Sequence, residues 1–210
     1  TTSGNETSGG LNTGALSLVV TVKDADQDPL SSTLDLGSVL RVNDDAPTGT
    51  ASLKAVTLGV DETAGINAPD NATTLPTGAL GSSTIAWSDL ATDTFAYGSD
   101  GFGSKTFDLQ VTNGTASGWL TSDGSKGIFL YENANGVIEG RVGTSTTVAN
   151  ASGDVAFTVT VGSDGTVTFT DYLAIQHTDT TSGNETSGGL NTGALSLVVT
   201  VKDADQDPLS

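Results

Sequence analysis

An identical internal repeat is the feature that most constrains what this chain of 210 residues can fold into. Thr1–Ser31 reads TTSGNETSGGLNTGALSLVVTVKDADQDPLS, and Thr180–Ser210 reads the same without a difference. The offset between the two copies is 179 residues. Solenoid repeats are far shorter, roughly 20 to 50 residues, whereas this period is the size of a whole domain. The sequence therefore predicts domain-sized units in tandem, with one full period and a short overlap in this chain.

Period-two alternation of apolar and polar residues predicts β-strands. Leu16–Val22 alternates in this way, and Phe157–Val161 and Val167–Phe169 flank a Gly-Ser-Asp-Gly turn that predicts a hairpin. Further strands are predicted at Leu34–Val42, Leu53–Val60, Thr106–Val111, Ile128–Tyr131, Val137–Val142 and Leu195–Val201. No segment carries a helical stripe over three turns. Short strands separated by Gly, Asn and Asp turns predict an all-β fold, and we expect an immunoglobulin-like (cadherin-like) β-sandwich repeat module.

The charge of the chain excludes several classes of partner. Twenty-five acidic residues face seven basic ones, which gives a net charge of −18. Such a surface repels nucleic acid and anionic membranes, and it suits a solvent-exposed protein that binds cations. The chain has no cysteine, so disulfides and thiolate metal sites are excluded. The chain also has no methionine, no apolar stretch long enough to cross a membrane and no visible signal peptide, so we expect a fragment of a longer protein.

The acidic run DADQD follows the strand that ends at Val22 and places carboxylates at Asp24, Asp26 and Asp28. Alternate carboxylates repel one another unless a hard divalent cation lies between them, and calcium takes six to eight oxygen ligands from flexible loops. The run is not an EF-hand, because Pro29 stands where that loop needs glycine and Asp35 where it needs glutamate. The second copy of the repeat places the same carboxylates at Asp203, Asp205 and Asp207.

Two further acidic clusters follow the first. One is formed by Asn43, Asp44 and Asp45 before Pro47, and the other by Asp61 and Glu62. Each cluster alone is equally compatible with a solvated turn. Together they predict one or two calcium ions at a domain boundary, with residues 1–46 as the last strands of a preceding repeat plus a calcium linker. Residues 47–210 are then a β-sandwich repeat that lacks its last strand.

Four segments resemble the tandem extender repeats of RTX (repeats-in-toxin) adhesins, which Gram-negative bacteria export by type I secretion. They are VNDDAPT, the upstream DADQD, the later VDETAG and GDVAFTVTVGSDGTVTFTDYLAIQH, and the resemblance covers most of the repeat unit. VNDDAPT also resembles the calcium linker of cadherins. Two departures are that Ala25 and Gln27 stand where the family usually has glycine, and that the GGxGxD calcium repeats are absent.

The resemblance implies β-sandwich modules with calcium at and near their junctions. It further implies neighbouring identical repeats as partners, a location on the bacterial cell surface, and a role in projecting a distal ligand-binding domain for cell adhesion or biofilm formation.

Motifs for catalysis are not visible in the sequence. His177 is the only histidine, and neither a nucleophile elbow nor a phosphate-binding loop is present, so we expect no enzyme. The alternative function is a carbohydrate-binding adhesive module that uses the stretch from Trp87 to Trp119. We interpret the aromatic residues as core or rim packing, and this group comprises Trp87, Phe107, Trp119, Phe129 and Tyr131.

The duplicated segment leads to one more expectation. The hairpin Leu16–Val42 belongs to the preceding module, and an isolated two-stranded hairpin is marginally stable in water. We therefore expect residues 1–42 to complete a sandwich. They would do so in their own chain, as in a circular permutation, or in a neighbouring chain by strand exchange.

Overall fold

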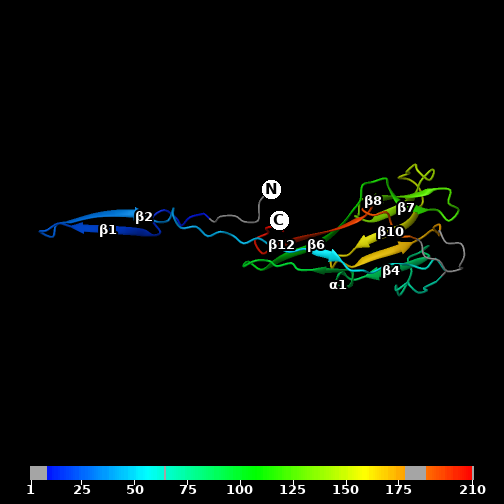
Figure 1. Cartoon of the computed structure of the whole chain (residues 1–210), viewed down its shortest axis with the longest axis horizontal. Coiled ribbons are helices and arrows are strands. Elements are labelled where there is room, and N and C mark those ends of the chain that lie inside the picture. The colour runs from blue at the N-terminus through cyan, green and yellow to red at the C-terminus, as the bar shows by residue number, and fades with distance from the viewer. Residues whose placement is uncertain (1–8, 64, 178–187, 210) are drawn as a thin grey trace. The chain divides into compact units, whose positions relative to one another are not determined.

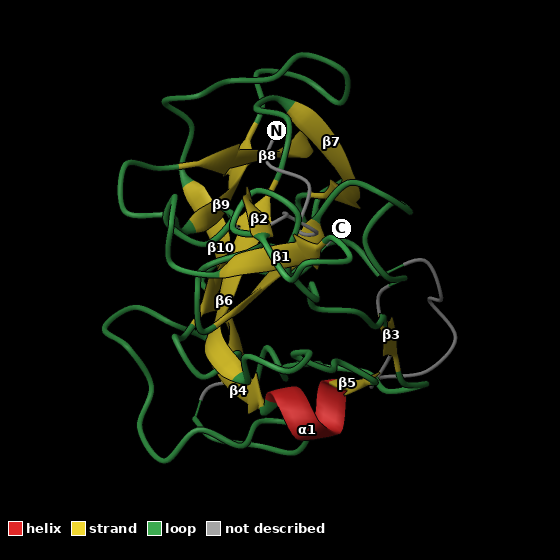
Figure 2. Ribbon diagram, turned by 90° about the vertical axis from the view of Figure 1, so that its left-hand side faces the viewer, coloured by secondary structure: helices red, strands yellow, loops and turns green. Residues whose placement is uncertain are grey.

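A computed structural model describes residues 9–63, 65–177 and 188–209 of the chain. It divides into two compact units. Unit 1 comprises Thr1–Gly49, Phe95–Ser104 and Val201–Ser210, and unit 2 comprises Thr50–Thr94 and Lys105–Thr200. Almost all regular structure is β, and the one helix of the described residues, α1 at Trp87–Leu90, is a single turn (Figures 1 and 2). The prediction of an all-β sandwich is confirmed.

A six-stranded antiparallel sheet forms most of unit 2. Its spatial order is β4 (Gly81–Ile85), β11 (Val167–Asp171), β10 (Val155–Val161), β9 (Ile138–Val142), β8 (Gly127–Glu132) and β7 (Thr115–Leu120). The predicted hairpin β10–β11 is confirmed, and the predicted strands β8 and β9 form a second hairpin; the Gly- and Asn-rich segments between the strands supply the turn residues that a tight reversal needs.

Three strand pairs complete the structure. Strand β12 (Ser196–Asp203) pairs with β6 (Phe102–Gln110), β3 (Ala51–Leu53) pairs with β5 (Ala91–Asp93), and β1 (Ser17–Lys23) pairs with β2 (Pro29–Asp35).

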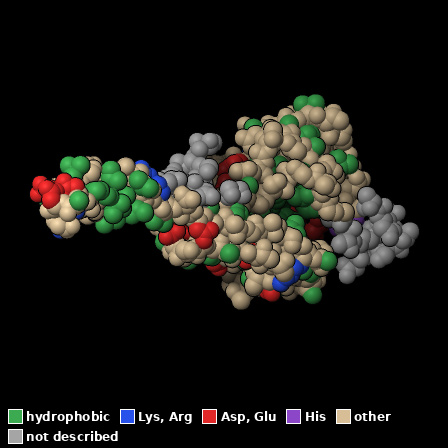
Figure 3. Space-filling view, turned by 60° about the vertical axis from the view of Figure 1, so that its left-hand side comes forward, with side chains coloured by type: hydrophobic (Ala, Val, Ile, Leu, Met, Phe, Trp, Pro, Cys, Tyr) green, Lys and Arg blue, Asp and Glu red, His purple; other side chains and the backbone are tan. Residues whose placement is uncertain are grey.

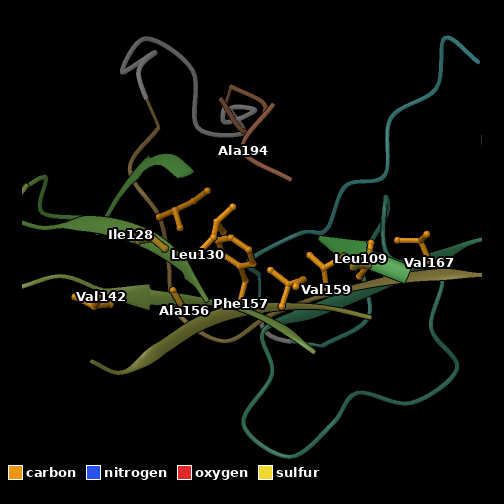
Figure 4. Close-up of a cluster of buried hydrophobic side chains, with 11 residues drawn as sticks. Leu109, Ile128, Leu130, Val142, Ala156, Phe157, Val159, Val167 and Ala194 are labelled. Atoms are coloured by element: carbon orange, nitrogen blue, oxygen red, sulfur yellow. The ribbon is translucent and has the colours of Figure 1, made fainter. Parts of the chain in front are cut away.

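The core lies between the six-stranded sheet and the β6–β12 pair. Ile128, Leu130, Ile138 and Phe157 are at most 1% exposed, and Leu109 of β6 packs against the same cluster (Figure 4). Leu195 and Leu197 add partly buried side chains to it. Gly140 lies directly beneath the ring of Phe157, where a Cβ atom would collide with that ring, so the position requires glycine. The alternating burial of β9 matches the period-two pattern from which it was predicted.

Two predicted strands differ from those observed. The return strand expected at Leu34–Val42 lies earlier, at Pro29–Asp35, because the chain already reverses within the acidic run. Gln27 has φ 75° and its amide donates to the carbonyl of Asp24 (3.1 Å), so the run is a tight turn and not an extended segment. The strand expected at Leu53–Val60 ends at Leu53, because its partner β5 begins at Ala91, directly after α1, so only the amide of Lys54 still donates to Leu90 in the same register.

Candidate metal centre

Two overlapping groups of carboxylates lie within unit 1. Asp44, Asp205 and Asp207 each place a carboxylate oxygen within 4.8 Å of the others, and Asp100, Asp203 and Asp205 do the same. Asp205 belongs to both groups. The structure therefore brings the second copy of the acidic run together with Asp44 of the predicted linker, whereas the sequence grouped Asp44 with the first copy. It adds Asp100, which sequence reasoning missed.

The turn Asp203–Asp207 presents the carboxylates of the second copy. The Asp203 carboxylate accepts the amide of Asp207 (2.8 Å), and the amide of Gln206 donates to the Asp203 carbonyl (3.2 Å). Gln206 has φ 81°, a left-handed conformation that reverses the chain within a few residues. This reversal, and not an extended backbone, gathers the alternate carboxylates.

The segment before β6 supplies Asp100. The amide of Ala204 donates to the carbonyl of Gly101 (3.1 Å), which holds this segment beside the acidic turn. Gly103 permits the close approach, because a Cβ atom there would collide with the Asp203 carbonyl. The sequence signal that could have indicated Asp100 is the run SDGFG, in which an Asp-Gly turn opens a strand that needs glycine for a close backbone contact.

The linker is fixed to the same segment by Asp45. Its carboxylate accepts the amide of Ser99 (3.1 Å) and the Ser99 hydroxyl (3.3 Å), while Pro47 is buried. Asp45 is therefore a bracing residue, and neither carboxylate group includes it or Asn43. Asp44, one residue earlier, is the linker residue that reaches the acidic turn.

The electrostatics of the two groups are unfavourable when every carboxylate is charged. The adjoining carboxyl group of Asp203, followed by desolvation, raises the pKa of Asp205 to about 6. The carboxyl group of Asp44 likewise raises the pKa of Asp100. The pKa of Asp44 itself is lowered, first by the amide of Asp45 and then by Asp207. Carboxyl groups in contact must share protons or a cation, because like charges at this range cannot all ionise without compensation.

Unpartnered carboxylate oxygens point to a cation as the missing partner. Asp203 is 0% exposed, and its Oδ2 has no hydrogen-bond partner; Oδ2 of Asp44 is also buried and unpartnered. A buried, unpaired carboxylate oxygen is costly, and a bound cation removes that cost. All donors are hard oxygens, as calcium prefers. Asp44, Asp100, Asp203, Asp205 and Asp207 therefore fit a calcium centre, and they are the residues that would hold it.

The first copy of the acidic run forms a third group. Asp24, Asp26 and Asp28 also bring carboxylate oxygens within 4.8 Å of one another, but all three residues are exposed. The group contains no further acid from elsewhere in the described residues. The acidic turn alone therefore gathers its own three carboxylates, whereas the second copy also gains Asp44 and Asp100.

The third predicted cluster has other contacts, in unit 2. Asp61 accepts the amide of Thr63 (2.7 Å), and Glu62 accepts the amide of Ile175 (2.8 Å) with its second oxygen 3.6 Å from Nε2 of His177. The acidic groups of the described residues include neither Asp61 nor Glu62. Asp171 is the buried acid of this region, 2% exposed, and desolvation followed by the charge of Glu62 raises its pKa to about 7.

The fold and the centre together define an acidic, all-β sandwich protein with clustered oxygen donors at a chain turn. The family comparison places it further: a model described as a domain of unknown function, DUF5801, matches residues 57–210, and the chain belongs to that family. No curated protein and no solved structure is significantly similar to the chain. Among the described residues, no helix has the length and apolar character that crossing a membrane requires.

Proposed function

We propose that this chain is a calcium-stabilised extender repeat of a large bacterial surface adhesin of the RTX type, which projects a distal ligand-binding domain for cell adhesion or biofilm formation. The observation that carries the calcium role is the pair of carboxylate groups that share Asp205 around the buried, unpartnered oxygen of Asp203. A net charge of −18 makes the compact state self-repelling, so cations that neutralise clustered acids stabilise it.

The identical repeat supports the spacer role. A domain-sized unit copied without a difference over 31 residues supplies length, and its partners are neighbouring identical repeats. The proposed location is the extracellular surface, where calcium is abundant. Because the chain has no cysteine, calcium can supply the cross-links that disulfides would otherwise supply. The role is structural and not enzymatic.

A carbohydrate site has no comparable support. Trp119 packs against Phe157 (ring centroids 5.1 Å apart) and Phe169 (6.0 Å), and Trp87 packs against Phe107 (5.0 Å). The indole of Trp87 is also covered by the ammonium group of Lys105, 4.7 Å from the ring centroid. Stacked and covered rings do not form an open platform for a sugar.

Calcium titration tests the proposal. Ligand linkage gives about 2.7 kcal/mol of added stability when free calcium is a hundredfold above its dissociation constant. The melting temperature should rise by several degrees from excess chelator to millimolar calcium, and calorimetry should report bound ions. Asp205→Asn should weaken this binding strongly, whereas Asp26→Asn, the same position in the first copy, should change it little. A melting curve that ignores calcium would contradict the calcium role.

A further inference from the structure

The hairpin β1–β2 has one apolar face that the chain leaves uncovered. The cross-strand pairs Leu18–Leu34 and Val22–Leu30 place their side chains on one face with Val20, while Val19, Thr21 and their partners occupy the other. Leu18, Val20, Val22, Leu30 and Leu34 are 47%, 43%, 61%, 76% and 52% exposed. In Figure 3 the apolar side chains lie along the hairpin, with acidic side chains at its turn.

The second copy of the repeat shows what covers this face. Val201, the counterpart of Val22, is 0% exposed, and Ala194, the counterpart of Ala15, is 4% exposed. Leu195 and Leu197, the counterparts of Leu16 and Leu18, pack against the hydrophobic core. The apolar face that is exposed in β1 is therefore partly buried in β12 at Leu197 and Val199, and fully buried at Val201. β12 pairs with β6, and the core packs against Leu195 and Leu197, so the module itself provides this cover.

The strand edges match as well. In the first copy Lys23 pairs with Pro29, and in the second copy Lys202 pairs with Pro208, which is the same register. β12 uses its other edge for β6. In β1 that other edge has no strand beside it among the described residues, because β1 pairs only with β2. A strand with an open edge and an apolar face is a ready template for strand addition.

The acidic turn of the first copy already has the conformation of the second. Asp28 donates its amide to the Asp24 carboxylate (3.0 Å), as Asp207 does to Asp203 (2.8 Å), and Gln27 and Gln206 have φ 75° and 81°. What the first copy lacks is the remainder of the centre, namely counterparts of Asp44 and Asp100. A second module contains both.

We infer that the β1–β2 hairpin is the docking element for a second copy of the module, in which β1 takes the position that β12 occupies here and Asp24, Asp26 and Asp28 complete the acidic centre. The chain's own module holds one such position and β12 fills it, so the partner is another copy. The inference rests on the proposed function in one respect, because it identifies the partner as a neighbouring module of the tandem array. The packing argument itself depends on the apolar face of the hairpin and not on calcium.

Mixing two variants of the full chain tests the inference. The acceptor carries Val201→Asn, which weakens the packing of β12, together with Val22→Asn, which makes the apolar face of its own hairpin polar. The donor is the wild-type chain, whose hairpin is free. We expect size-exclusion chromatography with light scattering to detect a donor–acceptor complex. The melting temperature of the acceptor should be higher in the mixture than for the acceptor alone. The matched control donor is Val22→Asn, which should give neither.

A second acceptor guards against a variant that fails to fold. Val201→Thr with Val22→Asn retains β-branching and introduces only a hydroxyl, so its β12 is weakened and not lost. Failure of both acceptors to bind the wild-type donor, or equal binding of the Val22→Asn donor, would overturn the inference. Running each mixture in chelator and in calcium separates the two proposals. A wild-type melting curve that ignores calcium contradicts the calcium role, while a complex that forms in chelator still supports docking.

Discussion

Val22 and Val201 occupy the same position in two identical segments, yet their side chains are 61% and 0% exposed. The backbone around them is the same in both copies, with an acidic turn closed by the same hydrogen bonds and the same left-handed glutamine. Local sequence therefore determines the turn. Only the second copy has β6, the core and the acids Asp44 and Asp100 beside it, so burial and the completed acidic centre come from tertiary context.

The largest difference between the copies should appear in the free energy of unfolding. Val201→Asn places an amide in a fully buried apolar position and should cost about 3 kcal/mol. Val22→Asn changes an exposed position and should stay within about 0.5 kcal/mol. Denaturant unfolding of the two variants measures both values. Equal losses would show that β1 is as well packed in solution as β12, against the exposure described above.

The second-largest difference between the copies should appear in calcium-dependent stability. Asp203→Asn keeps an oxygen to accept the Asp207 amide but removes a buried charge from the centre. It should abolish most of the calcium-dependent stability, about 2.7 kcal/mol at a hundredfold excess over the dissociation constant. Asp24→Asn, the same change in the exposed copy, should retain most of it. Thermal melts with and without chelator provide the test, and equal effects would mean that the acids act as diffuse charge.

Much of this arrangement could be predicted from the sequence. Alternation in Phe157–Val161 and the turn that follows it gave the β10–β11 hairpin, and the repeat with its alternate aspartates indicated the acidic turn. The early reversal at Gln27 was missed, because a left-handed glutamine carries no glycine or asparagine signal. Asp100 was missed because it lies about a hundred residues from the acidic turn, and only the pairing of β6 with β12 brings the two together.

The grouping of the three acidic clusters was likewise beyond sequence reasoning. Asp44 and Asp61 are close along the chain and both follow expected strands, so they were assigned to one boundary with one or two ions. The structure gives Asp44 carboxylates as neighbours, whereas Asp61 caps the amide of Thr63. Proximity in sequence does not decide which oxygens converge, because convergence depends on which strand ends meet.

Asp171, a buried acid that lies outside both copies of the repeat, should make stability depend on pH independently of the acidic turns. Burial raises the pKa of Asp171 to about 7, so the folded chain holds a proton there that the unfolded chain releases near pH 4. Its contribution to stability is therefore full at low pH and is lost as pH rises toward 7, by roughly 2 kcal/mol between pH 5 and 7. Asp171→Asn should remove this loss, measured in chelator. An unchanged pH profile would show that Asp171 is charged in the folded chain.

The smallest effect on stability should come from acids that accept hydrogen bonds within turns outside both copies of the repeat. The Asp123 carboxylate accepts the Thr121 hydroxyl (2.6 Å) and the Ser125 amide (3.0 Å), which lower its pKa to about 2. Asp164 is bonded in the same way to Thr166. Asp123→Ala and Asp164→Ala remove the same charge as Asp203→Asn but leave the acidic centre intact. Both should therefore lower the melting temperature slightly through the lost turn, with the calcium-induced shift unchanged. If either variant reduced that shift as much as Asp203→Asn does, net charge and not the centre would govern calcium binding, and the contrast between the two copies would lose its basis.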